Sequence, residues 1–346
     1  MDPLQPPTAP PPAPHDEGAW ARRALTLPAV AILATGLWSL LPTLVLVALA
    51  IDLTVGRRLS ALRTLGLCVA YVYADLFGLL AAGALWAGER TGLLTPEAVL
   101  AGHRRILRTW VRFLWAVGSR LFAIRLDVEG RDQVAPGPLL VLERHASLAD
   151  AVLGTLLVEV PHAVALRYAV KAELLWEPAF DVIGHRLGVA FVHRDARDRQ
   201  AERARIATLA RDLQPDEGVL IYPEGTRFTE AKRAKRIAEA QARRDAAAEA
   251  RARAFTHVLA PHPGGVLALL DDLPGVDVLV VAHAGLEAGV HLLDLVRGSL
   301  VGTRVRVRMW RVPAADIPAD RDARIAWLEA LWREVDAFVA GVSPEA

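Results

Sequence analysis

The stretch 138-PLLVLERHASLADAVLGTLLV-158 decides the fold that the sequence predicts. Its first part, Leu139–Leu142, is a short apolar run typical of a buried strand, whereas Ala149–Val158 has the pattern of a helix. A polar turn that begins at His145 joins the two. A strand, a turn with polar side chains and a helix form the repeating unit of an α/β domain.

Short apolar runs and helical segments keep alternating towards the C-terminus. The other predicted strands are Val189–Val192, Val219–Tyr222, Val276–Ala282 and Thr303–Met309. The other predicted helices are Ala201–Leu213, a long Ala-, Arg- and Glu-rich helix at 231–254, and Ala323–Val339. This alternation indicates that the larger part of the chain is an α/β domain.

The N-terminal part of the chain has a different composition. It starts with a Pro-rich, polar segment that cannot bury a core. Two apolar runs follow, one at 24–51 without a charged residue and one at 64–88 whose only charge is Asp75. Each run exceeds the roughly 20 residues that span a bilayer, although a buried helical hairpin of a soluble protein remains the alternative. The predicted division is a disordered tail at 1–23, a two-helix membrane anchor at 24–90 and a catalytic domain at 91–346.

Three details of the predicted anchor bear on how it sits in a membrane. Pro28 and Pro42 predict a kink in the first helix. Asp75 is costly in lipid, so we expect it to face the partner helix or water. Arginines precede, separate and follow the two runs, which leaves open whether the helices span the bilayer or dip into one leaflet. The next segment, 103–123, reads as a basic amphipathic helix that lies on a membrane surface or packs on the following domain.

Composition excludes several classes of protein. The net charge is +1 and no basic motif is present, so a nucleic-acid partner is not expected. Cys68 is the only cysteine and lies in an apolar run, which excludes a disulfide framework and a cysteine-based metal site. The sequence has no G-x-S-x-G elbow, no H-E-x-x-H zinc motif, no phosphate-binding Walker loop and no dinucleotide glycine pattern.

The first candidate for chemistry is the pair His145 and Asp150, which flank the start of the predicted helix. A hydroxyl is a weak nucleophile at neutral pH, so a base must remove its proton, and histidine suits this task. A neighbouring carboxylate fixes the tautomer of the imidazole. Two observations weaken the pattern when it stands alone. Ser147 and Asp150 also resemble a helix capping box, and His193 heads a second His-x4-Asp.

The second candidate is Tyr222-Pro-Glu-Gly-Thr-Arg227, which directly follows a predicted strand. A glycine turn exposes backbone N–H groups, and an arginine offers a planar fork for phosphate, so the segment is typical of an anion site. An ordinary polar turn is the alternative. Lys171 and the block Phe191-Val-His-Arg194 lie between the two candidates, and their cations suit an anionic head group or are plain surface charges.

In this order, the motifs resemble those of the 1-acylglycerol-3-phosphate acyltransferase superfamily, over about residues 126–340. The family pattern is His-x4-Asp, Phe-x-x-Arg, Glu-Gly-Thr-Arg and then an apolar strand after a proline. The text FVHRDARDR, EGTRFTEAK, HVLAP and AWLEALWREVDAF is most similar to the lysocardiolipin-type branch. Two positions depart from the pattern: Arg144 stands where the family usually has Asn, and Pro261-His-Pro-Gly-Gly-Val replaces Pro-Arg-Thr-x-Gly-Phe. The first concerns the positioning of His145, the second the identity of the acceptor.

The resemblance implies a fold and a reaction. The fold would be an α/β glycerolipid-acyltransferase-like domain, with a central mixed sheet flanked by helices, behind the two-helix anchor. The resemblance selects His145 over His193 as the general base, with Asp150 as its partner. The substrate-binding residues that it implies are Lys171, Phe191, Arg194, Glu224, Gly225, Thr226 and Arg227.

The reaction implied is transfer of an acyl group from acyl-CoA or acyl carrier protein to lysophosphatidic acid, without a metal or cofactor. Another lysophospholipid acceptor is one alternative, and a non-enzymatic membrane lipid-binding protein is another. The expected location is a bacterial inner membrane, with the active site at the cytoplasmic face.

Overall fold

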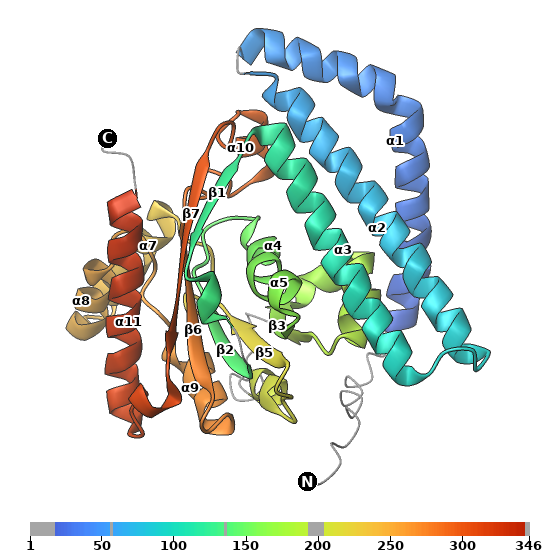
Figure 1. Ribbon diagram of the computed structural model, residues 1–346. Coiled ribbons are helices and arrows are strands. Elements are labelled where there is room, and N and C mark those ends of the chain that lie inside the picture. Colours follow the sequence, from blue (N-terminus) through green and yellow to red (C-terminus); the bar gives the residue numbers. More distant parts are fainter. Residues whose placement is uncertain (1–17, 56–57, 135–136, 193–203, 343–346) are drawn as a thin grey trace.

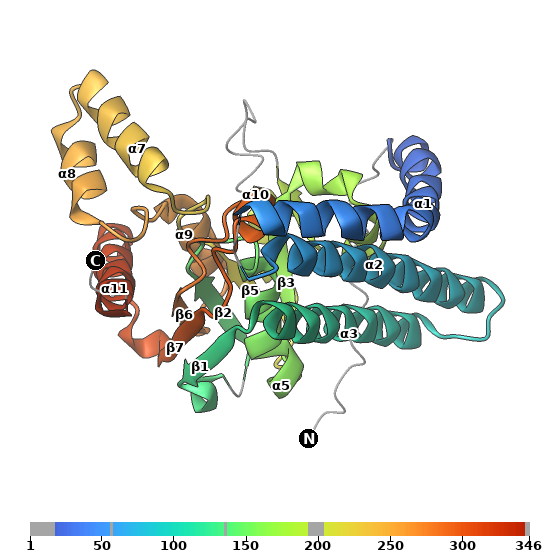
Figure 2. The same cartoon turned by 90° about the horizontal axis from the view of Figure 1, so that it is seen from above.

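The computed structural model describes residues 18–55, 58–134, 137–192 and 204–342. Three long helices lie beside a single sheet, and further helices cover the sheet on both faces (Figure 1). The long helices are α1 (Ala19–Val55), α2 (Ser60–Arg90) and α3 (Pro96–Phe122). Seen from above, they lie on one side of the sheet, while α7, α8 and α11 lie on the other (Figure 2).

The sheet has seven strands in the order β1-β7-β6-β2-β5-β3-β4. Their bounds are β1 (Arg125–Glu129), β2 (Leu139–Glu143), β3 (Ala165–Lys171), β4 (Ala190–Val192), β5 (Glu217–Ile221), β6 (Asp277–Ala284) and β7 (Arg304–Val312). All neighbours are parallel except β6 and β7, which are antiparallel, so the predicted mixed α/β sheet is confirmed. β2 lies near the centre because every residue of Leu-Leu-Val-Leu-Glu is buried, as expected for a strand covered on both faces.

Two apolar clusters hold the helices on the sheet. The shorter helices are α4 (Asp150–Gly154), α5 (Val160–His162), α7 (Glu230–Ala242), α8 (Ala246–Ala254), α9 (Pro263–Asp272), α10 (Leu292–Val296) and α11 (Arg321–Val342). On one face, α9 and α11 bury a cluster that contains Trp332 and Phe255. On the other, the stretch that includes α4 buries Leu153 and Leu157 against β2 and β5. Both faces of the central strands are therefore shielded from solvent.

Helices α1 and α2 have the length and composition to cross a membrane, by these criteria alone. The most apolar window of α1 is only 6% buried in the fold, which is unusual for a core helix of a soluble protein. α1 contains Pro28 and Pro42 and is sharply bent, as the prolines predicted (Figure 1). It begins at Ala19, before the predicted end of the tail at residue 23, because Arg22 and Arg23 both bind Asp181 of the domain. The rest of that tail, 1–17, lies outside the described residues.

Polar side chains fix the helical hairpin. The carboxylate of Asp52 near the end of α1 accepts hydrogen bonds from the backbone N–H groups of Ala61 and Leu62, at 2.9 and 3.0 Å. It thereby caps the start of α2, where Leu59 offers no side-chain cap. Asp75 in α2 accepts a hydrogen bond from the indole N–H of Trp110 in α3 at 2.7 Å. Asp75 therefore faces α3, and not the partner helix of the anchor or water as the sequence predicted.

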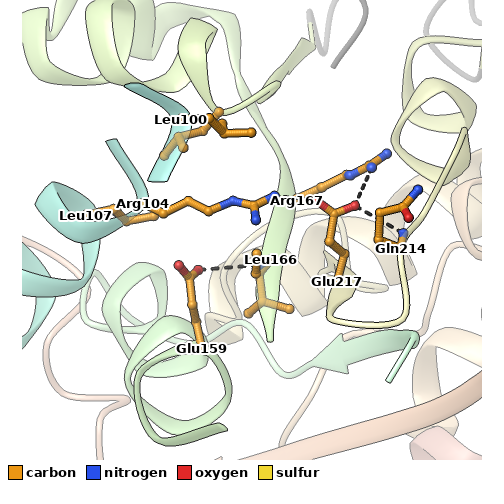
Figure 3. Close-up of a pocket in the computed structure, with 10 residues that line it drawn as sticks. Leu100, Arg104, Leu107, Glu159, Leu166, Arg167, Gln214 and Glu217 are labelled. Carbon is orange, nitrogen blue, oxygen red and sulfur yellow. Dashed lines mark hydrogen bonds and ion pairs between the residues drawn. The ribbon is translucent and has the colours of Figure 1, made fainter. Parts of the chain in front are cut away.

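Helix α3 packs on the domain through the basic face that the sequence predicted. Arg104 pairs with Glu217 at the start of β5, and Arg108 pairs with Glu159 at 3.1 Å. Figure 3 shows Arg104 and Arg167 directed at Glu217 from two sides of a small pocket. Glu217 begins β5, so this pocket lies at the opposite end of the strand from the Glu-Gly-Thr-Arg segment. Its charged groups bind one another, which makes it the joint between α3 and the sheet.

Two sequence predictions need correction. The helix predicted at 231–254 is two helices, α7 and α8, because Arg244 adopts a left-handed conformation and Asp245 caps α8 by accepting from the N–H of Ala248 at 2.9 Å. Strands β1 and β3 were not predicted. The helix predicted at 201–213 lies partly outside the described residues, and residues 204–210 are helical.

Candidate active site

Parallel strands bring the predicted motifs to one edge of the sheet. His145 follows β2, Tyr222–Arg227 follows β5, and Lys171 ends β3. The spatial order β2-β5-β3-β4 places these carboxyl ends next to one another. In open α/β sheets this edge is where ligands bind. Segments that are far apart in the sequence therefore form one candidate site.

His145 and Asp150 are in direct contact. Nδ1 of His145 lies 3.0 Å from Oδ2 of Asp150. Because a carboxylate only accepts, Nδ1 carries the hydrogen, and Nε2 keeps its lone pair for a substrate. The His145 side chain is 17% exposed, whereas that of Asp150 is fully buried. The ring of Tyr222 stacks on the imidazole with a centroid distance of 4.3 Å and holds its plane.

Asp150 serves as the hub of the loop and not only as a cap. Its Oδ2 also accepts from the backbone N–H groups of Ala146 and Ser147, and its Oδ1 accepts from the Ser147 hydroxyl at 2.6 Å. Burial alone would raise the pKa of Asp150, but His283, His145 and Ser147 hold it well below its ordinary value. The capping-box alternative and the catalytic interpretation therefore describe the same carboxylate.

Glu224 has a different role from the one predicted for it. Its carboxylate is fully buried, with Oε1 accepting from the backbone N–H of His145 and Oε2 from that of Leu259, each at 2.9 Å. Both oxygens are used inside the protein, so Glu224 is not placed to bind substrate directly. Burial raises the pKa of Glu224 to about 7, although Arg144 and the two N–H groups favour its charged form. The Glu-Gly-Thr-Arg segment thus holds the backbone of the candidate base.

The rest of that segment turns outward. Gly225 has a φ of +69°, a conformation that favours glycine. The hydroxyl of Thr226 accepts from Nζ of Lys232 at 2.9 Å, a lysine that the sequence analysis did not single out. Nη1 of Arg227 donates to the carbonyl of Val290 at 2.6 Å. Thr226, Arg227 and Lys232 therefore form a cationic corner beside His145 and Asp150. One guanidinium nitrogen of Arg227 is already bound to the protein.

Lys171 and Phe191 lie further along the same edge. Lys171 is exposed at the end of β3. Phe191 in β4 stacks on His185 with a centroid distance of 5.0 Å, so one face of its ring is already covered by the protein. Arg194 and the competing His193 lie outside the described residues.

Arg144 and His283 are buried behind the site, and the sequence analysis named only Arg144, as a departure from the family pattern. Arg144, which replaces the usual Asn, is fully buried and donates to the carbonyls of His283 and His257, at 2.6 and 2.8 Å, and to Glu287. His283 lies in β6, with Nε2 at 3.4 Å from Oδ1 of Asp150. The position of His283 inside an apolar run was the sequence signal for this histidine. The preceding residue, Glu143, is also fully buried.

Comparison with known proteins assigns the domain. Residues 125–268 match the acyltransferase family, a range that contains β1 to β5 and every predicted site residue. This part of the chain is an acyltransferase-family domain. The resemblance that the motifs indicated is therefore confirmed.

Individual relatives agree with this assignment. The chain is similar to 1-acyl-sn-glycerol-3-phosphate acyltransferase delta of Mus musculus, with 32% identity over 51% of the chain and 46% of the relative. It is 24% identical to lysocardiolipin acyltransferase 1 of Danio rerio, over 70% of the chain and 62% of the relative. The chain thus spans about half the length of the first relative. The fold is shared with the crystal structure of the 1-acyl-sn-glycerophosphate acyltransferase PlsC from Thermotoga maritima (TM-score 0.53, 16% identity, 83% of this chain and 98% of that one).

Proposed function

We propose that the chain is a membrane-bound acyltransferase that moves an acyl group from a thioester to the free hydroxyl of lysophosphatidic acid and forms phosphatidic acid. The observation that carries this proposal is the 3.0 Å contact between His145 and Asp150 at the ligand-binding edge of an acyltransferase-family domain. A protein that only bound lipid would not need a base held in one tautomer. The intact pair therefore favours the enzyme over the non-enzymatic alternative.

The proposed chemistry starts at the free nitrogen of His145. Nε2 takes the proton of the glycerol hydroxyl as its oxygen attacks the thioester carbonyl. Asp150 holds the imidazole and stabilises the imidazolium that forms. The tetrahedral intermediate then expels the thiolate, which receives the proton from His145, so the base is regenerated. No metal ion or cofactor takes part in these steps.

The cationic corner provides the contacts proposed for the acceptor phosphate. Arg227 lies two residues after Gly225, beside the loop that holds His145, and Thr226 and Lys232 lie with it. Lys171 extends the same edge, and Arg194 is proposed as a further phosphate contact. A charge-assisted hydrogen bond to phosphate contributes roughly 1.5–3 kcal/mol, enough to orient the acceptor hydroxyl towards the base.

A different head group is the second candidate, and one contact favours it. The segment that departs from the family pattern, 261–266, touches the Glu-Gly-Thr-Arg turn. The backbone N–H of His262 donates to the carbonyl of Pro223 at 2.7 Å, and its ring faces Gly225. A changed residue beside the proposed phosphate site is expected to change which lysophospholipid is accepted. The similarity to a lysocardiolipin acyltransferase is consistent with this candidate.

The proposed location is a bacterial inner membrane, with the site at the cytoplasmic face. Helices α1 and α2 supply the apolar surface. Leu148, Leu292 and Leu293 are about half exposed near the site, and α10, which carries the last two, is bound to α2 by a hydrogen bond from Ser60 to Val296 at 2.6 Å. This arrangement would let a lysolipid reach His145 from the bilayer.

A labelled-acyl assay tests the proposal. The purified protein in lipid nanodiscs would receive radiolabelled acyl-CoA or acyl carrier protein together with one lysophospholipid at a time. We expect the label in phosphatidic acid with lysophosphatidic acid as acceptor. Labelling only of another phospholipid would favour the second candidate, and no labelled phospholipid from the whole panel would contradict both.

A further inference from the structure

His283 is a fully buried histidine that the proposed chemistry does not yet use. β6, on which it lies, pairs with β2, and Val281 is opposite Glu143 in the register. Because His283 follows Val281 by two residues, it lies beside the loop that follows β2 and contains His145. Its position makes it a neighbour of the catalytic carboxylate and not of the substrate.

The contacts of His283 assign its hydrogen. Nε2 lies 3.0 Å from the carbonyl oxygen of Arg144 and 3.4 Å from Oδ1 of Asp150. Both atoms are acceptors, so Nε2 must carry the hydrogen, which is donated to the carbonyl of Arg144 and lies beside Oδ1 of Asp150. Burial lowers the pKa of His283, and Arg144 lowers it further, while Asp150 acts in the opposite direction. His283 is therefore a neutral donor.

The other ring nitrogen indicates that this histidine is not a simple packing residue. Nδ1 is buried and has no hydrogen-bond partner among the described residues. A buried acceptor without a partner is unfavourable, and an apolar side chain would avoid that cost. What an apolar side chain cannot supply is the N–H that binds the carbonyl of Arg144 beside the carboxylate of Asp150.

We propose that His283 is a positioning residue: on the side of Asp150 opposite His145, its polar N–H lies beside Oδ1 and attracts the negative charge of the carboxylate. His145 is bound to Oδ2, whereas His283 contacts Oδ1. The proposal rests on the function proposed for the His145–Asp150 pair. By drawing charge density towards Oδ1, His283 limits how strongly Asp150 stabilises the imidazolium that forms on His145.

Arg144 holds His283 in this orientation. The guanidinium donates to the carbonyl of His283 at 2.6 Å, while His283 donates to the carbonyl of Arg144 at 3.0 Å. The two side chains therefore bind each other's backbone across β2 and β6. These two hydrogen bonds leave the ring of His283 little freedom to turn away from Asp150.

Several charged and titratable groups surround His283, Asp150 and His145. They are Glu143, Arg144, Glu224, Glu287 and Tyr222, which stacks on His145. The residue opposite His283 on β7 is the apolar Val307.

Three substitutions separate the role of the donor from that of packing. His283→Leu removes the N–H but keeps an apolar group of similar bulk. His283→Gln places an amide N–H near the position of Nε2. His283→Asn keeps an amide whose shorter side chain does not reach Asp150. All three variants would be compared as full chains in nanodiscs, after thermal unfolding has identified those that fold.

The first readout is the pH profile of kcat/KM. We expect His283→Leu and His283→Asn to move the midpoint of the acid limb to higher pH by roughly half a unit to one unit, with kcat lowered and the acceptor KM unchanged. His283→Gln should restore the midpoint of the wild-type chain. If His283→Leu does not fold, the Gln and Asn pair makes the same comparison. An unshifted midpoint in the folded Leu or Asn variant overturns the proposal, and so does a Gln variant that fails to restore it.

The second readout does not need turnover. Diethyl pyrocarbonate reacts with the neutral form of an imidazole and not with its protonated form. The rate of carbethoxylation of His145, measured by mass spectrometry across pH, therefore follows the protonation of this histidine. The midpoint for His145 should shift upward in the Leu and Asn variants and return with Gln. The shift is expected even if none of the tested lipids is a substrate, which distinguishes failure of this proposal from failure of the proposed function. An unshifted carbethoxylation midpoint contradicts the role of His283.

Discussion

Oε1 of Glu224 accepts a hydrogen bond from the backbone N–H of His145 at 2.9 Å, so the two sequence motifs are joined through a buried carboxylate. The other oxygen holds the backbone of Leu259. Glu224 therefore ties the loop after β2 to the loop after β5 and to the segment before α9. The position of the candidate base depends on a residue that the motif alone assigns to the substrate.

Replacing Glu224 with Gln should damage catalysis more than acceptor binding. Glutamine has one oxygen and one NH2 group, so one of the two backbone N–H groups loses its acceptor, at a cost of roughly 1–3 kcal/mol. We expect a clear fall in kcat with a small change in the acceptor KM. Glu230→Gln, at an exposed position in α7, is the matched control. Normal turnover of the Glu224 variant would contradict this role.

Much of the fold was predictable from local patterns, and the exceptions have physical reasons. β2, β5, β6 and β7 are apolar or alternating runs, which signal burial directly. β1 (RLDVE) and β3 (ALRYAVK) mix charges with apolar residues, because β1 is an edge strand and β3 is largely half-buried. No glycine or proline marks the break between α7 and α8, which depends on the cap at Asp245.

The sequence predicted which residues meet in the candidate site, but not the buried contacts that hold them. The order of the motifs predicted that His145 and Asp150 meet, and they do. It could not reveal that Glu224 points inward, because a buried and an exposed carboxylate have the same letter in a sequence. Nor could it reveal His283, whose partners Arg144 and Asp150 lie after β2 and become its neighbours only when β6 pairs with β2.

Arg227→Ala should weaken use of the acceptor more than use of the donor. Loss of a charge-assisted contact to phosphate is expected to raise the acceptor KM roughly tenfold or more, with the donor KM nearly unchanged. Arg227→Lys should recover part of the effect, because it restores charge but not the planar fork. Arg243→Ala, an exposed arginine after α7, is the control. A raised donor KM with an unchanged acceptor KM would disprove the assignment.

Glu143→Gln should stabilise the protein at alkaline pH. Burial and the charge of Asp150 raise the pKa of Glu143 well above its ordinary value, and neither carboxyl oxygen has a hydrogen-bond partner in the described part of the chain. The folded state therefore keeps the proton, while the unfolded chain releases it above about pH 4.5. The free energy of unfolding falls as pH rises, by up to ~1.4 kcal/mol per unit for this group.

Thermal unfolding at two pH values measures this contribution. Glutamine mimics the protonated carboxyl at every pH, so the variant should have a higher Tm than the wild-type chain at pH 8 and a similar Tm at pH 4.5. The same Tm difference at both values would mean that Glu143 is not the titrating group.

Detergent should be required to extract the protein. α1 exposes apolar side chains along most of its length, and α2 exposes Phe77, Leu80 and Trp86 in its second half; water solvates such surfaces poorly. We expect the protein in the membrane pellet after lysis and after a high-pH carbonate wash, and in the supernatant only after detergent is added. Quantitative recovery in the soluble fraction without detergent would favour the buried-hairpin alternative.

The most direct test of the proposed mechanism compares His145→Ala with His193→Ala, because both histidines head a His-x4-Asp pattern. Each variant would be shown to be folded and membrane-inserted, and its kcat would then be measured with the acceptor identified in the lipid panel. The account predicts that His145→Ala lowers kcat by roughly 10²–10⁴-fold, as expected for loss of a general base, while His193→Ala stays clearly active. Near-normal turnover of His145→Ala together with an inactive His193→Ala would contradict it.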